Sequence, residues 1–468
     1  MDSSSSSSSQ RSPAPELPGF YYDPEKNRYF RLLPGHNNCN PLTKESIQQR
    51  EMESKRLKLL EEDQQSKKTI RTGLNSLFLL QKRQLGLLSS TSYCRRVHEL
   101  KANCMKRQKV TIRNPEFCAG TGADHFQLML ADATSERAFM VKNDTDQGGY
   151  KFGIINLDSL WKGHFRLKMC DNFYFLHSKI SSACWASVTH PDSHLLLCIM
   201  GIAENPGSVT LLPVSYFSNT LTRHRTNSQS LATEWGEADR PEMLSNINIP
   251  IGWSCAWSLN PQAHNYFSTG LTRRVYVTNV ATGHRQIFST DSDVLAQQFA
   301  TQSPVLYNGC RSGEIFSVDI RQHIRKGCSR KCSHFFHDSA VTSLKVLQDE
   351  NYLMVADMAG KIKLWDLRTM NCVIQYEGHN NQYAHLPLHV NEEEGLLLAV
   401  GQDCYTRIWN LQDSHLLRTI PSPHPTSKDS IPNVVFSSRL GGKRGVPGLL
   451  MAVKQDLFYF SYNTDTQS

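Results

Sequence analysis

The chain has 468 residues, of which 39% are hydrophobic and 20% charged, with a formal net charge of +8. This composition excludes a mostly disordered protein and allows one large folded domain plus an extension. No apolar run approaches the roughly 20 residues that a membrane-spanning helix needs, and the opening MDSSSSSSSQ lacks the apolar core of a signal peptide. We therefore expect an intracellular protein, in the nucleus, the cytoplasm or both. The 13 cysteines are an odd number scattered mainly through apolar segments, so we expect reduced thiols rather than disulfides.

The first 110 residues differ from the rest of the chain. Residues 1–15 are rich in serine and are expected to be disordered. Residues 16–110 form an extension that opens with an aromatic segment, Phe20 to Phe30, folded around a turn. Next comes a charged helix predicted from Leu42 to Asp63, capped by Thr43 and polar nearly all round. Such a helix is typical of a solvent-exposed spacer.

A second helix, predicted at about residues 74–88, is amphipathic. At 100° per residue its apolar side chains fall within an arc of about 100°, the width of a face that packs on a surface or in a groove. Gly86 inside the helix costs about 1 kcal/mol relative to Ala and indicates a close backbone approach. The residue pattern alone favours packing on the chain's own domain over packing on a partner. The apolar positions are Leu74, Leu77, Phe78, Leu85 and Leu88.

Positive charge is concentrated in this extension. Between Lys44 and Lys109 there are 16 Lys and Arg against 7 Asp and Glu, a net charge of +9. The remaining chain is therefore nearly neutral, which weighs against nucleic-acid binding by the main domain, because phosphate binding needs a positive surface.

The main domain contains repeats. The stretches GEIFSVDIR (Gly313 to Arg321) and GKIKLWDLR (Gly360 to Arg368) are each a short strand that ends in Asp-x-Arg, and YTRIWNL (Tyr405 to Leu411) repeats the pattern with a different ending. The spacing is 47 residues from Asp319 to Asp366 and 44 from Asp366 to Asn410. This period is close to that of propeller blades, about 40 to 45 residues.

Weaker copies on both sides bring the number of units to seven. The fold class predicted is therefore all-β, a seven-bladed WD40 β-propeller over residues 120–463, preceded by a partly helical and partly disordered extension. The excess length lies mainly near residues 206–250, which we expect to form a surface loop. The units begin near Phe126, Ile180, Gly252, Val294, Val341, Leu386 and Asn433.

Polar residues are expected to tie the blades internally. In the unit that ends at Trp409 the members are His379 and Asp403, which stands six residues before Trp409. In the unit that ends at Trp365, His337 is present but Ala359 occupies the aspartate position. We infer a degenerate repeat in which burial of the core provides most of the stability.

The Asp-x-Arg endings have a physical interpretation of their own. Residues two apart on a strand point the same way, so Asp366 can hold the guanidinium of Arg368, and Asp319 that of Arg321. An ordered arginine at the rim suits a bidentate contact with a partner. The alternative is an internal surface ion pair worth about 0 to 1 kcal/mol.

Signatures of catalysis are missing. The sequence contains no P-loop, no Gly-x-Ser-x-Gly and no His-Glu-x-x-His, so we expect no enzyme activity and no cofactor. Cys328, Cys332, His334 and His337 could in principle surround zinc. Their spacing matches no common zinc finger and His337 already has a role in its blade, so we expect no metal.

Particular motifs resemble a known family. The paired Asp-x-Arg endings resemble the WDxR boxes of substrate receptors for the cullin-4 ubiquitin ligase, although Val318 replaces Trp in the first. LLQKRQLGLL (Leu79 to Leu88) is similar to the helix that such receptors insert into the ligase adaptor, damage-specific DNA-binding protein 1. The stretch from Leu17 to Ser46, together with MAGKIKLWDLR, resembles the fourth numbered family of cullin-4 associated factors.

This resemblance implies a non-catalytic, substrate-recognition subunit of a cullin-4 ubiquitin ligase. The implied partners are damage-specific DNA-binding protein 1, the cullin-4 ligase and a protein substrate that the sequence does not identify. The alternative is a non-catalytic WD40 scaffold in RNA or ribosome assembly that attaches through its basic amino-terminal extension. The residues implied in adaptor binding are Asp319, Arg321, Asp366, Arg368, Leu77, Leu80, Arg83, Leu85 and Leu88.

Overall fold

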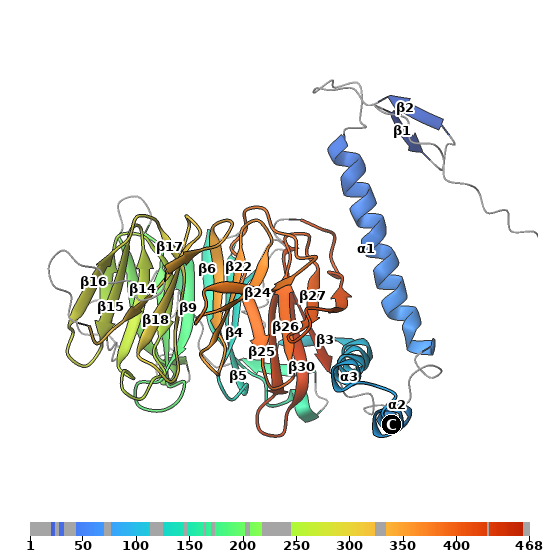
Figure 1. The fold of residues 1–468 in the computed structure, drawn as a ribbon. Helices are drawn as coiled ribbons and strands as arrows, with labels where there is room; N and C mark the ends of the chain where they lie inside the picture. Colours follow the sequence, from blue (N-terminus) through green and yellow to red (C-terminus); the bar gives the residue numbers. More distant parts are fainter. Residues whose placement is uncertain are drawn as a thin grey trace, which may run out of the picture. The chain divides into compact units, whose positions relative to one another are not determined.

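The computed structural model places the chain in two compact units, the first ending at Lys68 and the second beginning at Thr69. The Ser-rich tail and Thr43 lie outside the described residues. None of the helices in the described part of the chain combines the length and apolarity needed to span a membrane. The structure describes residues 20–23, 28–31, 44–69, 76–112, 125–144, 148–162, 165–169, 174–201, 206–217, 245–322, 334–427 and 430–461 (Figure 1).

The first unit contains a small hairpin and a long helix. The aromatic segment forms strands β1 (Phe20–Asp23) and β2 (Arg28–Arg31), which pair in antiparallel register. Tyr22 lies opposite Tyr29, as expected for aromatic residues on both sides of a turn. Helix α1 (Lys44–Thr69) extends beyond the predicted end at Asp63.

The second unit opens with two helices, α2 (Ser76–Gln84) and α3 (Ser90–Cys104). Together they are called the helical arm below. The Ser89 hydroxyl caps α3 by accepting a hydrogen bond from the backbone N–H of Ser92 at 3.2 Å. Sequence analysis did not anticipate α3, which leads directly into strand β3 (Lys106–Ile112).

Within the described residues the other strands complete seven four-stranded sets, or blades. Blades 1 to 3 are β4 (His125–Ala131), β5 (Arg137–Asp144), β6 (Gly149–Asn156) and β7 (Arg166–Met169), with β8 (Tyr174–Leu176) also paired to β6; β9 (Ile180–Ala186), β10 (His194–Ile199), β11 (Gly207–Pro213) and β12 (Ser245–Ile249); and β13 (Gly252–Trp257), β14 (Tyr266–Leu271), β15 (Arg274–Asn279) and β16 (Arg285–Ser289).

The remaining blades follow in chain order. Blades 4 to 7 are β17 (Val294–Phe299), β18 (Val305–Cys310), β19 (Glu314–Asp319) and β20 (His334–Phe336); β21 (Val341–Val346), β22 (Tyr352–Asp357), β23 (Ile362–Asp366) and β24 (Asn371–Tyr376); β25 (Leu388–Asn391), β26 (Leu396–Val400), β27 (Thr406–Asn410) and β28 (Leu416–Ile420); and β29 (Asn433–Leu440), β30 (Val446–Val453) and β31 (Asp456–Ser461) with β3. The strand sets agree with the seven units predicted from sequence.

The last blade is closed by a strand from the other end of the unit. β3 pairs antiparallel with β31, with Lys106 opposite Ser461 and Val110 opposite Leu457. Two residues at the end of β3 also pair in parallel with β7 of blade 1. This strand lies before residue 120, and it joins the first and last blades through backbone hydrogen bonds.

The core lies between the blades. The first strands of consecutive blades contact one another in a closed cycle that runs from β4 through β29 and back to β4. Seven hydrophobic clusters fill the seven spaces between neighbouring blades among the described residues. Trp409 is fully buried between blades 5 and 6 and is the largest side chain of the cluster there. These observations confirm the predicted all-β propeller.

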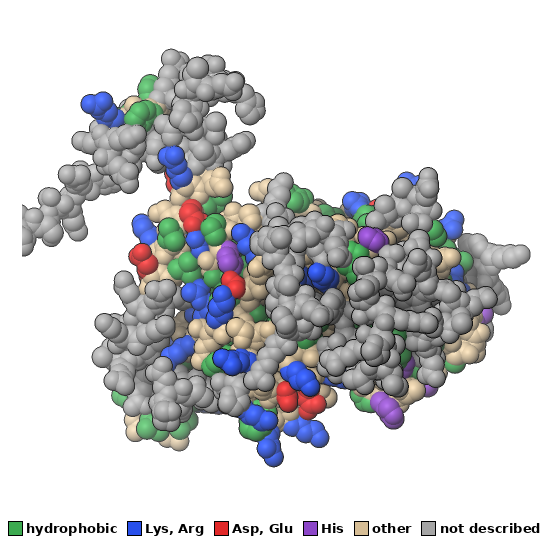
Figure 2. Space-filling view, turned by 180° about the vertical axis from the view of Figure 1, so that it is seen from behind, with side chains coloured by type: hydrophobic (Ala, Val, Ile, Leu, Met, Phe, Trp, Pro, Cys, Tyr) green, Lys and Arg blue, Asp and Glu red, His purple; other side chains and the backbone are tan. Residues whose placement is uncertain are grey.

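Two sets of loops lie at opposite ends of the blades, because neighbouring strands are antiparallel. In blade 5, Asp366 at the end of the third strand lies opposite Tyr352 and Asn371, so the first and the third loop of the blade share one face. The helical arm lies at this face beside blade 6, where Lys101 contacts Glu394 at 2.9 Å. We call it the arm face. Figure 2 shows the molecule from behind the view of Figure 1, with several groups of Lys and Arg side chains on its surface.

Candidate functional site

The Asp-x-Arg ending of blade 5 forms a turn that fixes its arginine. Asp366 ends β23, and Arg368 lies in the turn that follows. The Asp366 carboxylate accepts the backbone N–H of Arg368 at 2.8 Å, its Nε–H at 3.2 Å and its Nη2–H at 2.9 Å. The arginine is therefore ordered by an Asx turn past the strand and not by alternation along the strand, as the sequence argument assumed.

Blade 4 repeats this geometry one position around the ring. Asp319 accepts the backbone N–H of Arg321 at 3.0 Å, its Nε–H at 3.1 Å and its Nη2–H at 2.8 Å. The side chains of Arg321 and Arg368 are 64% and 62% exposed. Each aspartate takes two of the five N–H donors of its guanidinium, so the others are available to a partner.

The electrostatics of both pairs keep them ionised. Hydrogen bonding by Arg321 lowers the pKa of Asp319, and hydrogen bonding by Arg368 lowers the pKa of Asp366. The aspartates in turn raise the pKa of each arginine. Two charged, exposed and pre-ordered hydrogen-bond donors therefore lie on neighbouring blades of the arm face.

The flanking blades use the same turn without the arginine. In blade 3 the side-chain oxygen of Asn279 accepts the backbone N–H of Ala281 at 2.9 Å. In blade 6 the oxygen of Asn410 accepts the backbone N–H of Gln412 at 3.0 Å. Asparagine keeps the turn but provides no carboxylate for a guanidinium. The arginine pair is thus a local feature of blades 4 and 5.

The helical arm covers blade 6 beside the turn after β27, which is equivalent to the arginine turns of blades 4 and 5. Glu99 of α3 contacts His415 Nε2 at 3.3 Å. Arg418 of β28 donates from Nη1 to the carbonyl oxygen of Met105 at 3.0 Å and also to that of Ala102, so it satisfies carbonyls at the end of α3. This mount was not predicted from the sequence, although the Ser-rich start of α3 at Ser89 is a recognisable cap signal.

Helix α2 turns most of its apolar side chains outward. Leu79 is buried, whereas Leu77, Phe78 and Leu80 are exposed. Leu85, just past the helix, is 73% exposed. The predicted residue Leu88 is half-buried, and the Arg83 guanidinium lies 4.7 Å from the centroid of the Tyr93 ring.

Gly86 ends α2 and does not mark a close approach. Its φ of +70° is the left-handed conformation that favours glycine, and nothing lies within 4 Å of the position where a Cβ would be. The Leu87 N–H donates to the Lys82 carbonyl at 2.9 Å and the Gly86 N–H to the Arg83 carbonyl at 3.0 Å. This is a Schellman motif, which explains why the helix ends before residue 88.

The residues predicted to tie the blades behave differently in blades 5 and 6. His337 Nδ1 lies 3.1 Å from Asp357 Oδ2, and both side chains are fully buried beside Trp365. Asp357 thus provides the carboxylate that was expected at the position occupied by Ala359.

In blade 6, Asp403 binds Arg407 at 3.0 Å. The Trp409 indole N–H donates to the Glu377 carbonyl at 2.9 Å, and the His379 ring centroid lies 6.4 Å from that of Trp409.

The zinc hypothesis gains no support in the described part of the chain. Cys328 and Cys332 lie outside the described residues. His334 Nε2 lies 2.9 Å from Glu314, and His337 contacts Asp357. Among the residues described, no group of three or more His, Cys, Asp or Glu side chains is arranged to hold a metal ion.

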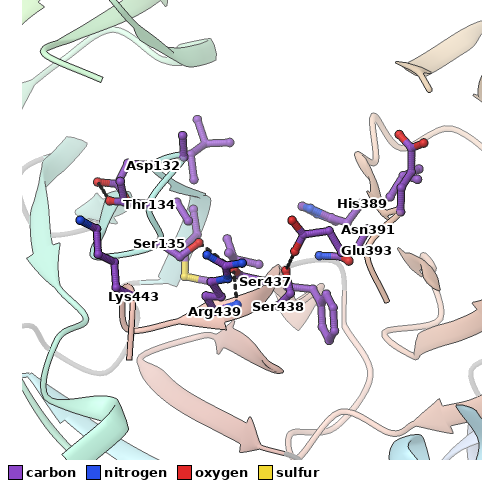
Figure 3. Close-up of a pocket in the computed structure, with 18 of the residues that line it drawn as sticks. Asp132, Thr134, Ser135, His389, Asn391, Glu393, Ser437, Ser438, Arg439 and Lys443 are labelled. Carbon is purple, nitrogen blue, oxygen red and sulfur yellow. Dashed lines mark hydrogen bonds between the residues drawn. The ribbon is translucent and has the colours of Figure 1, made fainter. Parts of the chain in front are cut away.

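A pocket of about 580 Å³ opens on the arm face between blades 6, 7 and 1 (Figure 3). Its acidic lining residues are already engaged: Asp132 pairs with Arg137 at 2.9 Å, and Glu393 accepts a hydrogen bond from Ser438. Lys443 and Arg439 line the same pocket.

A ring of four-stranded blades with WD-type repeats defines a WD-repeat β-propeller, here with two ordered arginines at one rim and a helical arm mounted on blade 6. The family model described as the DDB1- and CUL4-associated factor 4 beta-propeller domain matches residues 93–462. The chain belongs to this family.

Relatives match over nearly the whole chain. DDB1- and CUL4-associated factor 4 of Homo sapiens is 60% identical over 461 residues, which cover 98% of this chain and 90% of that protein. The Bos taurus protein of the same name is 60% identical over 462 residues, with the same coverage of both chains. DDB1- and CUL4-associated factor 4-like protein 2 of Homo sapiens is 51% identical over 411 residues, 88% of this chain and 100% of that protein.

Proposed function

We propose that the chain is a substrate-recognition subunit of a cullin-4 ubiquitin ligase and that it docks on DDB1 through its arm face. The names of the relatives indicate association with DDB1 and CUL4. The observation that carries the proposal is the presence, on one face, of two exposed arginines ordered by aspartates and a helix with exposed leucines.

The arginines provide directional contacts in this proposal. Arg321 and Arg368 are held before the partner arrives, so little side-chain entropy is lost when they bind. A planar guanidinium with free N–H groups suits carbonyl or carboxylate acceptors on DDB1. Each charged hydrogen bond contributes about 1.5 to 3 kcal/mol when its acceptor is otherwise buried.

Helix α2 provides apolar contact. Leu77, Leu80 and Leu85 are exposed in the isolated chain, and each leucine that is fully buried by a partner contributes about 1.5 to 3 kcal/mol. The mount of α3 on blade 6 holds α2 near the rim, so a single partner can contact the helix and the arginines together. We propose that Arg83 and Leu88 lie at the border of this contact.

The chain itself makes or breaks no covalent bond in this proposal. Another surface of the propeller holds the protein substrate, and the ligase transfers ubiquitin because the substrate is kept close to it. The identity of the substrate does not follow from the docking face.

Co-purification of the full chain tests the proposal. Recovery of DDB1 and CUL4 with the wild-type chain is expected, in amounts that fall when Arg321 and Arg368 are both replaced by Ala. The scaffold alternative instead expects RNA that is released by salt, with no DDB1. Recovery of RNA without DDB1 would reject the receptor function.

A further inference from the structure

Four exposed cationic side chains gather on the arm face at the junction of blades 7 and 1. We call them the basic rim: Lys162, Arg439, Lys443 and Arg444. Lys162 belongs to the third loop of blade 1, and the others lie at or in the first loop of blade 7. Within the described part of the chain, none of the four forms an ion pair with a carboxylate.

The loop that carries the rim is firmly seated. Gly441 and Gly442 adopt φ of +97° and +96°, a conformation that favours glycine. The Gly441 N–H donates to the Ser135 carbonyl at 2.9 Å. A Cβ at Gly441 would lie 3.0 Å from the carbonyl oxygen of Leu157, so the loop of blade 7 packs directly on blade 1.

An aromatic ring holds two of the cations near each other. Arg444 lies 5.4 Å from the ring centroid of Trp161, and Lys162 lies 5.2 Å from the same centroid. Cation–π contacts of this kind contribute about 0.5 to 1 kcal/mol at exposed sites. These contacts offset part of the repulsion between the two positive charges. Without them, a carboxylate of the chain would be expected to relieve this repulsion.

Two exposed carboxylates, Asp158 and Glu136, lie in loops of blade 1 at the rim, and a Cβ at Gly442 would lie 2.9 Å from Glu136 Oε1, but the cations outnumber them. Asp132 in the adjoining pocket is paired with Arg137. Glu393, on the blade 6 side of the pocket, keeps its charge and accepts a hydrogen bond from Ser438 (Figure 3). On the outer strand β7, Arg166 and Lys168 are exposed and extend the positive charge along blade 1. The junction of blades 7 and 1 is therefore positively charged.

The position of the rim relative to the helical arm is informative. The arm is mounted on blade 6 through Lys101 and Arg418. Arg368 and Arg321 lie on blades 5 and 4, on one side of this mount, and the basic rim lies on blades 7 and 1, on the other side. A partner that receives α2 is thus flanked by cations on both sides.

We propose that the basic rim is a second contact surface for the protein that takes α2, and that this protein presents acidic side chains to it. The inference rests on the proposed function and extends it to blades 7 and 1. Exposed charges around a docking site act mainly on the association rate, because they attract the partner before contact and are screened by salt. The rim therefore increases the association rate, whereas the ordered arginines and the leucines lower the dissociation rate.

The test is a charge reversal with a matched control. Lys443→Glu combined with Arg444→Glu changes the net charge by the same amount as Arg273→Glu combined with Arg274→Glu. The latter pair is exposed on the opposite face, at the loop between β14 and β15 of blade 3. Association and dissociation rates of each full-length variant with purified DDB1 are measured by surface plasmon resonance at about 50 mM and about 300 mM salt.

At low salt we expect the rim variant to associate about 10-fold more slowly than wild type, and the control less than about 2-fold more slowly. The difference should shrink at high salt, while both dissociation rates stay within about 2-fold of wild type. Should the reversal lower the melting temperature, Lys443→Gln combined with Arg444→Gln replaces it, with a smaller decrease expected.

Four results overturn the inference. Equal association rates for the rim variant and the control show that only net charge matters. A rim variant that loses binding to a single-stranded RNA probe but not to DDB1 assigns the surface to nucleic acid. If wild type itself does not bind DDB1, the proposed function and this inference both fail; if wild type binds and the rim variant is unaffected, only the inference fails.

Discussion

Blades 5 and 6 are built from the same repeat but use it in different ways. Blade 5 leaves its third turn open and displays Arg368, held by Asp366. Blade 6 keeps the turn with Asn410, lacks the arginine, and is covered by α3 through His415 and Arg418. One repeat thus exposes an ordered arginine, while its neighbour supports helix α3.

Their interiors differ as well. Blade 5 buries a His337–Asp357 pair, whereas in blade 6 His379 is half-buried without such a carboxylate and Asp403 is directed to Arg407. Both blades nevertheless keep four strands and a packed core. The comparison teaches that core burial determines the blade, and that the surface turn can change its role without altering the fold.

The largest expected effect comes from removing the arginines of the open turns. Arg321→Ala combined with Arg368→Ala is expected to weaken binding to DDB1 by about 100- to 1000-fold, because two charged hydrogen-bond donors are lost. Isothermal titration calorimetry measures the change. Gln412→Ala, at the equivalent turn position of blade 6, is the matched control and should leave the affinity within about 2-fold. Equal affinities for all three proteins would remove the distinction between the two turns.

A charge on the arm should have the next largest effect. Leu85→Asp places a carboxylate where we propose apolar burial, and a decrease in DDB1 affinity of about 30- to 100-fold is expected. Val373→Asp, at an exposed apolar position on the outer strand of blade 5, is the control and should have little effect. A normally folded Leu85→Asp variant with wild-type affinity would show that α2 does not enter the interface.

The interior difference predicts unequal losses of stability. Asp357→Ala leaves His337 fully buried with neither ring nitrogen hydrogen bonded to a described side chain, so we expect a loss of about 2 kcal/mol. Asp403→Ala should cost more, about 3 kcal/mol, because it leaves the Arg407 side chain, which is only 13% exposed, without its carboxylate. Urea unfolding followed by tryptophan fluorescence compares the two variants. Equal losses would indicate that both carboxylates play the same role.

The smallest effect concerns pH. Burial, together with the charge of Arg407, lowers the pKa of His379 to about 4, below the roughly 6.5 of an unfolded histidine. The unfolded chain therefore binds the proton first, so this contribution to stability is complete above about pH 6.5 and decreases as the pH falls toward 4. His379→Gln should make the free energy of unfolding less dependent on pH between pH 7 and 5, by an amount on the order of 1 kcal/mol. The melting temperature, measured at each pH, should therefore vary less in this variant. An unchanged slope would show that the pKa of His379 is the same in the folded and unfolded states.

Local sequence patterns predicted much of this architecture. The strand alternation and the 44- to 47-residue spacing indicated the repeat units, and the Asp-x-Arg motifs located Arg321 and Arg368. The closing strand β3 was not predicted, because KRQKVTI is mostly polar and pairs with β31, about 350 residues away along the chain.

The site also contains features that depend on tertiary contacts. The mount of α3 depends on Arg418 and His415, which no local pattern connects with Glu99. A carboxylate was expected at position 359, which is occupied by Ala359, but Asp357 provides it. This too depends on where the buried His337 ring points. Gly86 was interpreted as a packing site because helical periodicity does not distinguish a helix interior from a C-terminal cap.

Hydrogen–deuterium exchange of the full chain with and without DDB1 tests the central claim most directly. Bound DDB1 should slow exchange in α2 and in the turns after Asp319 and Asp366, while the loop between β14 and β15 on the opposite face stays unchanged. Slower exchange confined to that opposite face, with α2 and both turns unaffected, would contradict the account.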